Sequence, residues 1–75
     1  MNFNNLTKGE RFVVDWQYDL GGSFAKYLAF AISKADTTNR EKLRKGFPEE
    51  VQAMYDYQNT AGWWENVESK LKDRK

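Results

Sequence analysis

The sequence predicts an all-α fold, a compact bundle of four to five short helices in which residues 1–75 form a single domain. Apolar residues recur at spacings of three and four, and capping residues and glycines separate the segments. No stretch alternates at period two for long enough to require a strand. A chain of this length has a thin core, which its three Trp, four Tyr and five Phe are expected to supply.

The first helix is expected to follow Thr7 and to extend to about Tyr18. Thr7 and Glu10 have the spacing of a capping box, in which each side chain accepts from the other residue's backbone N–H. The side chains expected to be buried are Phe12, Val13, Trp16 and Leu20. Gly21 and Gly22 are expected to end the helix, because glycine tolerates the left-handed conformation found there.

The second helix is expected to run from Phe24 to about Lys34, with Ser23 as its cap. The apolar stripe predicted for it comprises Phe24, Tyr27, Leu28, Ala31, Ile32 and Ala35. Phe30 lies off this stripe and suggests a second contact face. We expect this helix and the helix that starts at Pro48 to form the centre of the bundle.

The third helix is short and follows a cluster of capping residues, Asp36 to Asn39. Thr38 and Glu41 have the spacing of a second capping box. The helix is expected to run to Lys45, with Leu43 as its main apolar anchor.

The fourth helix is expected to start at Pro48, since proline suits the first turn of a helix. Glu49 and Glu50 follow it, where negative charge complements the helix dipole. The face predicted for this helix comprises Val51, Met54, Tyr55 and Gln58. We expect Trp16 and Trp64 to close the two ends of the bundle.

The last helix follows a break at residues 59–62 and is expected to run from Trp63 to about Asp73. The side chains expected to be buried are Trp64, Val67 and Leu71. Outside the helices, residues 1–6 and 73–75 are expected to fray.

The residue types needed for most enzyme chemistry are missing, because the sequence contains no Cys and no His. It therefore offers neither a thiolate nor the usual general base, and the commonest metal ligands are absent. Asp15 and Asp19 share a helix face, and we interpret them as solvated charges. Glu49 and Glu50 point about 100° apart on a helix, and we interpret them as helix-start charges. We expect no catalytic residues, no metal and no cofactor.

Membrane insertion is not expected from the sequence. The most apolar stretch, Phe24 to Ile32, is short and contains Lys26, whereas a spanning helix needs about 20 apolar residues. The segment from Met1 to Asn5 has neither the basic start nor the apolar run of a signal peptide. We expect a cytoplasmic protein.

The basic run Arg40, Lys42, Arg44 and Lys45 is one candidate binding feature. Arg40 and Arg44 lie four residues apart and would project together from a helix, where they could hold phosphates or an acidic protein patch. The alternative is a solvated surface that complements the helix dipole. A net charge of +1 indicates no strongly basic nucleic-acid binder.

Trp63 is the second candidate feature, because it lies beside Trp64, which belongs to the predicted buried stripe. Neighbours on a helix point about 100° apart, so Trp63 either packs over the end of the bundle or is partly exposed as a binding hot spot. Tyr57, close to Tyr55, presents the same alternatives. The candidate partner-binding residues are therefore Trp63, Tyr57, Arg40, Arg44 and Lys45.

Three segments of the sequence resemble small proteins of bacteriophages and other mobile elements. They are Ala31-Ile32-Ser33-Lys34-Ala35-Asp36, Lys42-Leu43-Arg44-Lys45-Gly46-Phe47-Pro48-Glu49-Glu50-Val51 and Gly62-Trp63-Trp64. The resemblance covers residues 22–64 and consists of packing and capping motifs. It implies an accessory protein expressed inside a bacterial host, and it carries no catalytic or binding residue across to this chain.

These observations favour a non-enzymatic protein that binds and modulates a host protein. Inhibition of a bacterial defence system is one concrete form of this hypothesis. The alternative is a small nucleic-acid-binding factor that uses the basic helix from Arg40 to Lys45. Self-assembly through exposed aromatic side chains is a third hypothesis, so both a monomer and a homodimer are considered.

Overall fold

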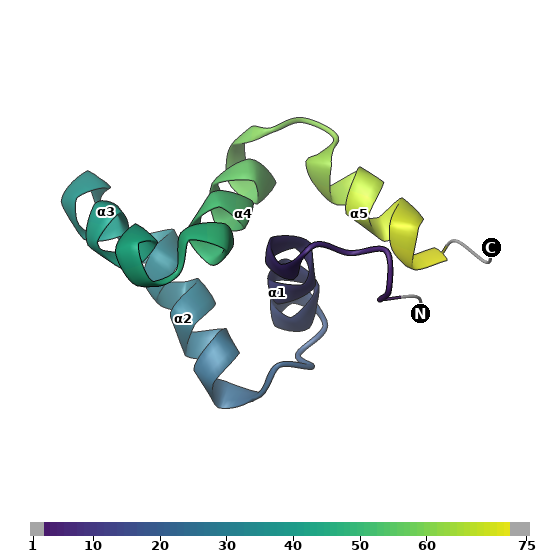
Figure 1. The fold of residues 1–75 in the computed structure, drawn as a ribbon, viewed down its shortest axis with the longest axis horizontal. Coiled ribbons are helices and arrows are strands. Elements are labelled where there is room, and N and C mark those ends of the chain that lie inside the picture. Colours follow the sequence, from purple (N-terminus) through teal and green to yellow (C-terminus); the bar gives the residue numbers. More distant parts are fainter. Residues whose placement is uncertain (1–2, 73–75) are drawn as a thin grey trace.

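The structure is a computed structural model, and it describes residues 3–72 of the chain. That range contains five helices and no strand, which confirms the predicted all-α bundle (Figure 1). The helices are α1 (Lys8–Gln17), α2 (Gly22–Lys34), α3 (Thr37–Gly46), α4 (Pro48–Asn59) and α5 (Trp63–Lys72). No helix in this range is long and apolar enough to cross a bilayer.

The centre of the bundle is α4, which contacts each of the other four helices and lies between α3 and α5 in Figure 1. Its most extensive contact is with α1, so the expectation that α2 would share the centre is wrong. The reason lies at Gly9, where a Cβ atom would lie 2.8 Å from the Glu49 carbonyl oxygen and 2.9 Å from the Ala53 Cβ. Glycine at this position allows α1 to approach α4 more closely than a larger residue would.

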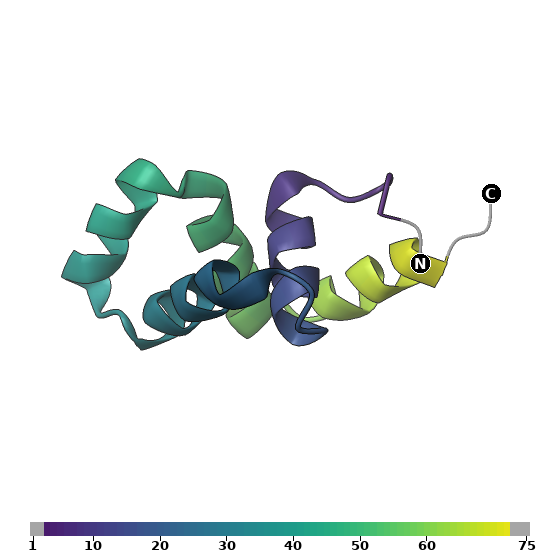
Figure 2. The same ribbon diagram turned by 90° about the horizontal axis from the view of Figure 1, so that it is seen from below.

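The helices form a flat arrangement, with extents of 41 × 27 × 17 Å (Figure 2). The core of this arrangement is divided into two clusters. The larger cluster lies between α1, α2 and α4 and comprises Phe12, Val13, Leu28, Ala29, Ile32, Val51, Ala53 and Met54. The smaller cluster joins α1 to α5 and comprises Val14, Val67 and Leu71. Phe3 and Leu6, in a segment expected to fray, pack against this smaller cluster. The expectations for residues 1–2 and 73–75 fall outside the described residues.

Both ends of α1 lie where they were predicted, but the residue that ends the helix is not one of the two glycines. The backbone N–H of Thr7 donates to the Glu10 carboxylate at 2.9 Å, and the Glu10 N–H donates to the Thr7 hydroxyl at 3.1 Å, which completes the capping box. The last helical residue is Gln17 and Tyr18 is the C-cap, and the helix cannot continue to the glycines because Asp19 adopts the left-handed conformation with φ of 58°. Aspartate tolerates this conformation better than most residues.

The predicted Ser23 cap is wrong, and the α3 cap lies in the predicted cluster but not at Thr38. The second helix starts at Gly22, one residue before Ser23, and no side chain caps it. Gly22 has φ of +73°, a conformation that favours glycine at this tight junction. In α3 the cap is Asp36, whose carboxylate accepts from the Asn39 N–H at 2.8 Å. The helix therefore begins before Thr38 can cap it.

The predicted stripe of α2 is only half buried. Leu28 and Ile32 lie in the core, whereas Phe24 and Tyr27 are each 68% exposed. The buried side of the helix is a sector of about 100° that contains Ala25, Leu28, Ala29 and Ile32. Three other side chains expected to be buried are exposed, namely Leu20, Ala31 and Tyr55. The α2 helix is apolar on more than one side, and α1 and α4 cover only one of these sides.

Candidate interaction surfaces

The three tryptophans, all half-buried, gather around Tyr57. Its ring lies 5.5 Å from that of Trp16, 5.7 Å from that of Trp64 and 6.5 Å from that of Trp63, in edge-to-face arrangements that are favourable for aromatic pairs. The Gln17 side-chain amide donates to the Tyr57 hydroxyl at 3.0 Å. Trp16 and Trp64 therefore share one cluster, and the expectation that they close opposite ends of the bundle is wrong.

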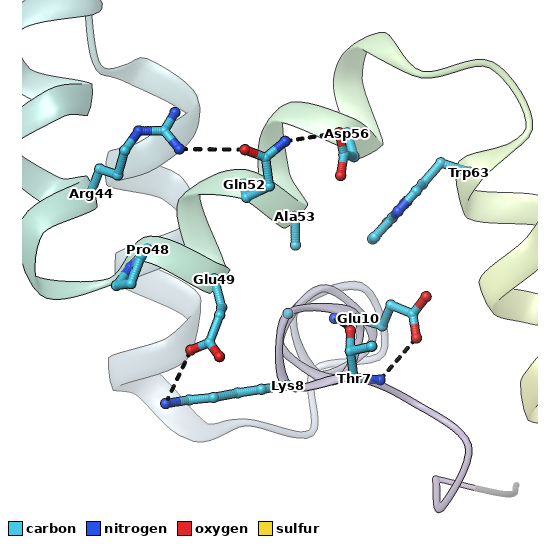
Figure 3. Close-up of a pocket in the computed structure, with 11 residues that line it drawn as sticks. Thr7, Lys8, Glu10, Arg44, Pro48, Glu49, Gln52, Ala53, Asp56 and Trp63 are labelled. Carbon is cyan, nitrogen blue, oxygen red and sulfur yellow. Dashed lines mark hydrogen bonds and ion pairs between the residues drawn. The ribbon is translucent and has the colours of Figure 1, made fainter.

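Trp63 combines the two alternatives considered for it. It is half-buried and packs against both core clusters. Figure 3 shows its indole ring projecting from the start of α5 towards the space between α1 and α4. Part of this side chain therefore packs against the core, and part of it faces an open cleft.

The cleft has a volume of about 550 Å³, and its charged groups already have partners within the chain. Lys8 lies 3.6 Å from the Glu49 carboxylate. Arg44 donates to Gln52 at 3.4 Å, and Gln52 donates to Asp56 at 3.1 Å (Figure 3). The lining residues are Thr7, Lys8, Gly9, Glu10, Arg44, Pro48, Glu49, Gln52, Ala53, Asp56 and Trp63.

Glu10 is the one buried charged residue among those described, and it is neutralised at the edge of this cleft. The Lys70 ammonium donates to both carboxylate oxygens, at 2.8 and 3.0 Å. Burial alone would raise the pKa of Glu10. The hydrogen bonds from Lys70 and Thr7, with the positive charge of Lys70, outweigh that effect and place the pKa below its ordinary value.

The basic residues of α3 are divided between internal bonds and solvent. Arg40 is half-buried and donates to the Ala35 carbonyl at 3.3 Å. Arg44 lies 3.6 Å from Glu41 and also reaches the cleft, whereas Lys45 is exposed. Among the candidate partner-binding residues, the structure thus brings Arg44 and Trp63 to one cleft and leaves Arg40 and Lys45 outside it.

A third surface was not predicted as a binding site, and it lies on the outer side of α2. Phe24 and Tyr27 are 68% exposed and Phe30 is 59% exposed, and Ala31 is exposed beside them. These four residues span about 120° of the helix, and we call them the α2 aromatic face. The signal was present in the sequence, because Phe30 lay off the predicted stripe and marked a helix too apolar to be covered on one side only.

The neighbours of the α2 aromatic face do little to cover it. The Phe24 ring lies 6.1 Å from that of Phe47, and the Lys34 ammonium lies 5.6 Å from the centre of the Phe30 ring. The side chain of Tyr27 makes no hydrogen bond or ring contact with any residue in the range 3–72. This face is therefore the largest group of exposed rings on the described part of the chain.

Comparisons with models of protein families, with curated proteins and with solved structures gave no match. Within residues 3–72 the structure shows no group of three or more acidic side chains placed to hold a metal ion.

Proposed function

We propose that this chain is a non-enzymatic accessory protein of a phage or other mobile element, and that it binds and modulates a host protein in the bacterial cytoplasm. Inhibition of a bacterial defence system is one concrete form of this function. The bacterial host is proposed because residues 22–64 resemble small phage-type proteins.

The observation that carries the proposal is the α2 aromatic face. The core is closed without these rings: Val13, Val51 and Met54 are fully buried elsewhere in the bundle. Exposed aromatic side chains that the fold does not need are costly in water, and they are the residue type most enriched at binding hot spots. Their presence on one helix favours a protein-binding role.

The direct test places a photo-crosslinking phenylalanine analogue at Tyr27 in cells of a bacterial host. The matched control carries it at Tyr55, an exposed tyrosine on α4 that is 46% accessible. We expect one dominant covalent adduct with a host protein from position 27 and none from position 55, read by mass spectrometry. The same set of adducts from both positions, or none from either, would contradict the proposal.

Nucleic-acid binding through the basic helix is the alternative function. Lys42 and Lys45 are exposed and have no ion-pair partner among residues 3–72, which favours it. Arg40 and Arg44 are already bonded within the chain, which leaves few cations to neutralise phosphates. The test is an electrophoretic shift assay at low salt. A shift that is lost in the Lys42→Ala and Lys45→Ala double variant would support this alternative over a protein partner.

A further inference from the structure

We infer that the α2 aromatic face docks an amphipathic helix of the partner protein, and that acidic residues flank the apolar stripe of that helix. This inference rests on the proposed function and adds to it the surface that binds and the chemistry of the segment bound.

The area of the face suits a helix. Taking about 200 Å² for each aromatic side chain, the three exposed rings offer roughly 400 Å² of apolar surface. A standard interface takes about 800 Å² from each partner, of which somewhat more than half is apolar. The α2 aromatic face thus supplies most of the apolar part of one side of a standard interface.

The shape of the surface also suits a helix. The face is about 120° wide, which matches the apolar stripe by which one helix packs on another. Beside Ala31 it continues into a shallow hollow of about 400 Å³ between α2 and α3, and Leu43 lies in its wall. An apolar side chain from a helix laid along α2 can enter this hollow, as in helix-in-groove recognition.

The positive charge around the α2 aromatic face favours a partner segment that carries acidic residues. No acidic residue occurs between residues 20 and 35, whereas Lys26 and Lys34 lie on α2 and Lys42 borders the hollow. None of these three lysines has an ion-pair partner among the described residues, although four other cations do. An acidic segment would neutralise them. A second copy of this chain would instead bring its own Lys26 and Lys34 against them.

Two synthetic helical peptides test the charge requirement directly. Both carry leucine at helical spacing, and their flanking positions carry glutamate in one peptide and lysine in the other. We expect the acidic peptide to bind at least tenfold more tightly, with affinity falling as salt increases. The Lys34→Glu and Lys42→Glu double variant should reverse the preference, and Lys8→Glu on α1 should leave it unchanged. Equal binding of the two peptides, or no binding of either, would overturn the inference.

The host adduct formed at position 27 separates this inference from the proposed function. We expect sequencing of the crosslinked segment to show aspartate or glutamate beside apolar residues at helical spacing, and the double variant to reduce adduct yield at least tenfold. A host adduct that persists undiminished in the double variant would refute the acidic partner and leave the proposed function standing. An adduct with a second copy of the chain would overturn both.

Binding to anionic lipid is tested separately, because lysines beside exposed rings also suit a phosphate-rich membrane surface. Co-sedimentation with phosphatidylglycerol vesicles should be no greater than with phosphatidylcholine vesicles. Binding to phosphatidylglycerol that is lost in Tyr27→Ser would assign the face to a membrane and overturn the inference.

Discussion

Lys70 and Glu10, sixty positions apart in the chain, form a partly buried ion pair with N–O distances of 2.8 and 3.0 Å. Glu10 belongs to the capping box that starts α1, and Lys70 lies in the last turn of α5. A single carboxylate thus connects the local structure of the first helix to the position of the last. Because the smaller core cluster has only three buried residues, this pair is expected to contribute much of the stability of the α1–α5 contact.

Replacing Lys70 by methionine should destabilise the protein by about 2 kcal/mol, because a buried carboxylate would lose its charged hydrogen-bond donor. Lys72→Met is the matched control, since Lys72 is exposed on the same turn and forms no ion pair among the described residues. Urea unfolding followed by tryptophan fluorescence measures both variants. Equal stability of the two variants would show that the pair contributes nothing.

The pH dependence of stability should carry the signature of Glu10. Its pKa is lowered in the folded state, so the folded protein binds fewer protons than the unfolded chain in acid. The contribution is complete above the ordinary glutamate pKa of about 4.3 and is lost as the pH falls through the lowered native pKa. In Lys70→Met the decline of stability in this range should be shallower. An unchanged slope in urea titrations at acidic pH would argue against the assignment.

Gly9→Ala should destabilise the bundle by about 1–3 kcal/mol, the usual effect of overpacking. The added methyl group would meet backbone atoms of α4, which cannot move aside as a flexible side chain can. Gly46→Ala is the control, because its Cβ would meet nothing within 4 Å and the better helix former should leave stability unchanged or raise it. Thermal unfolding of the two variants compares them, and similar melting temperatures would mean that α1 and α4 do not approach closely.

Met54→Ala should destabilise the protein by about 2–5 kcal/mol, because Met54 is fully buried in the larger core cluster. Tyr55→Ala, at the next position along α4, should change stability by less than about 1 kcal/mol, since that side chain is largely exposed. The reverse order in urea unfolding would show that α4 presents a different face to the core.

Much of the fold could be predicted because its helix boundaries depend on local chemistry. Pro48, the Thr7–Glu10 box and the break before Trp63 each act within a few residues, and all three appear in the structure. Local chemistry alone does not determine every cap. Several residues near Asp36 could cap α3, and the choice among them depends on where the rest of the chain holds the helix.

The candidate site was harder to predict, because exposure depends on which helices come into contact. Periodicity predicted an apolar helix from Phe24 to about Lys34, but it could not show that α1, through Gly9, would pack beside α4. Phe24 and Tyr27 were consequently assigned to the core. Trp63 and Arg44, two of the candidate partner-binding residues, line one cleft, and the polar groups of the chain already bond to one another there.

The proposed docking surface requires that α2 keep an aromatic face that the rest of the chain does not cover. Hydroxyl-radical footprinting of the isolated, dilute protein measures this directly, since Tyr18, Tyr27, Tyr55 and Tyr57 report on four environments. We expect Tyr27 to be modified fastest and Tyr57, half-buried within its ring cluster, to be modified most slowly. Modification of Tyr27 at a rate no higher than that of Tyr57 would mean that the face is already covered, and the proposed docking surface would not exist.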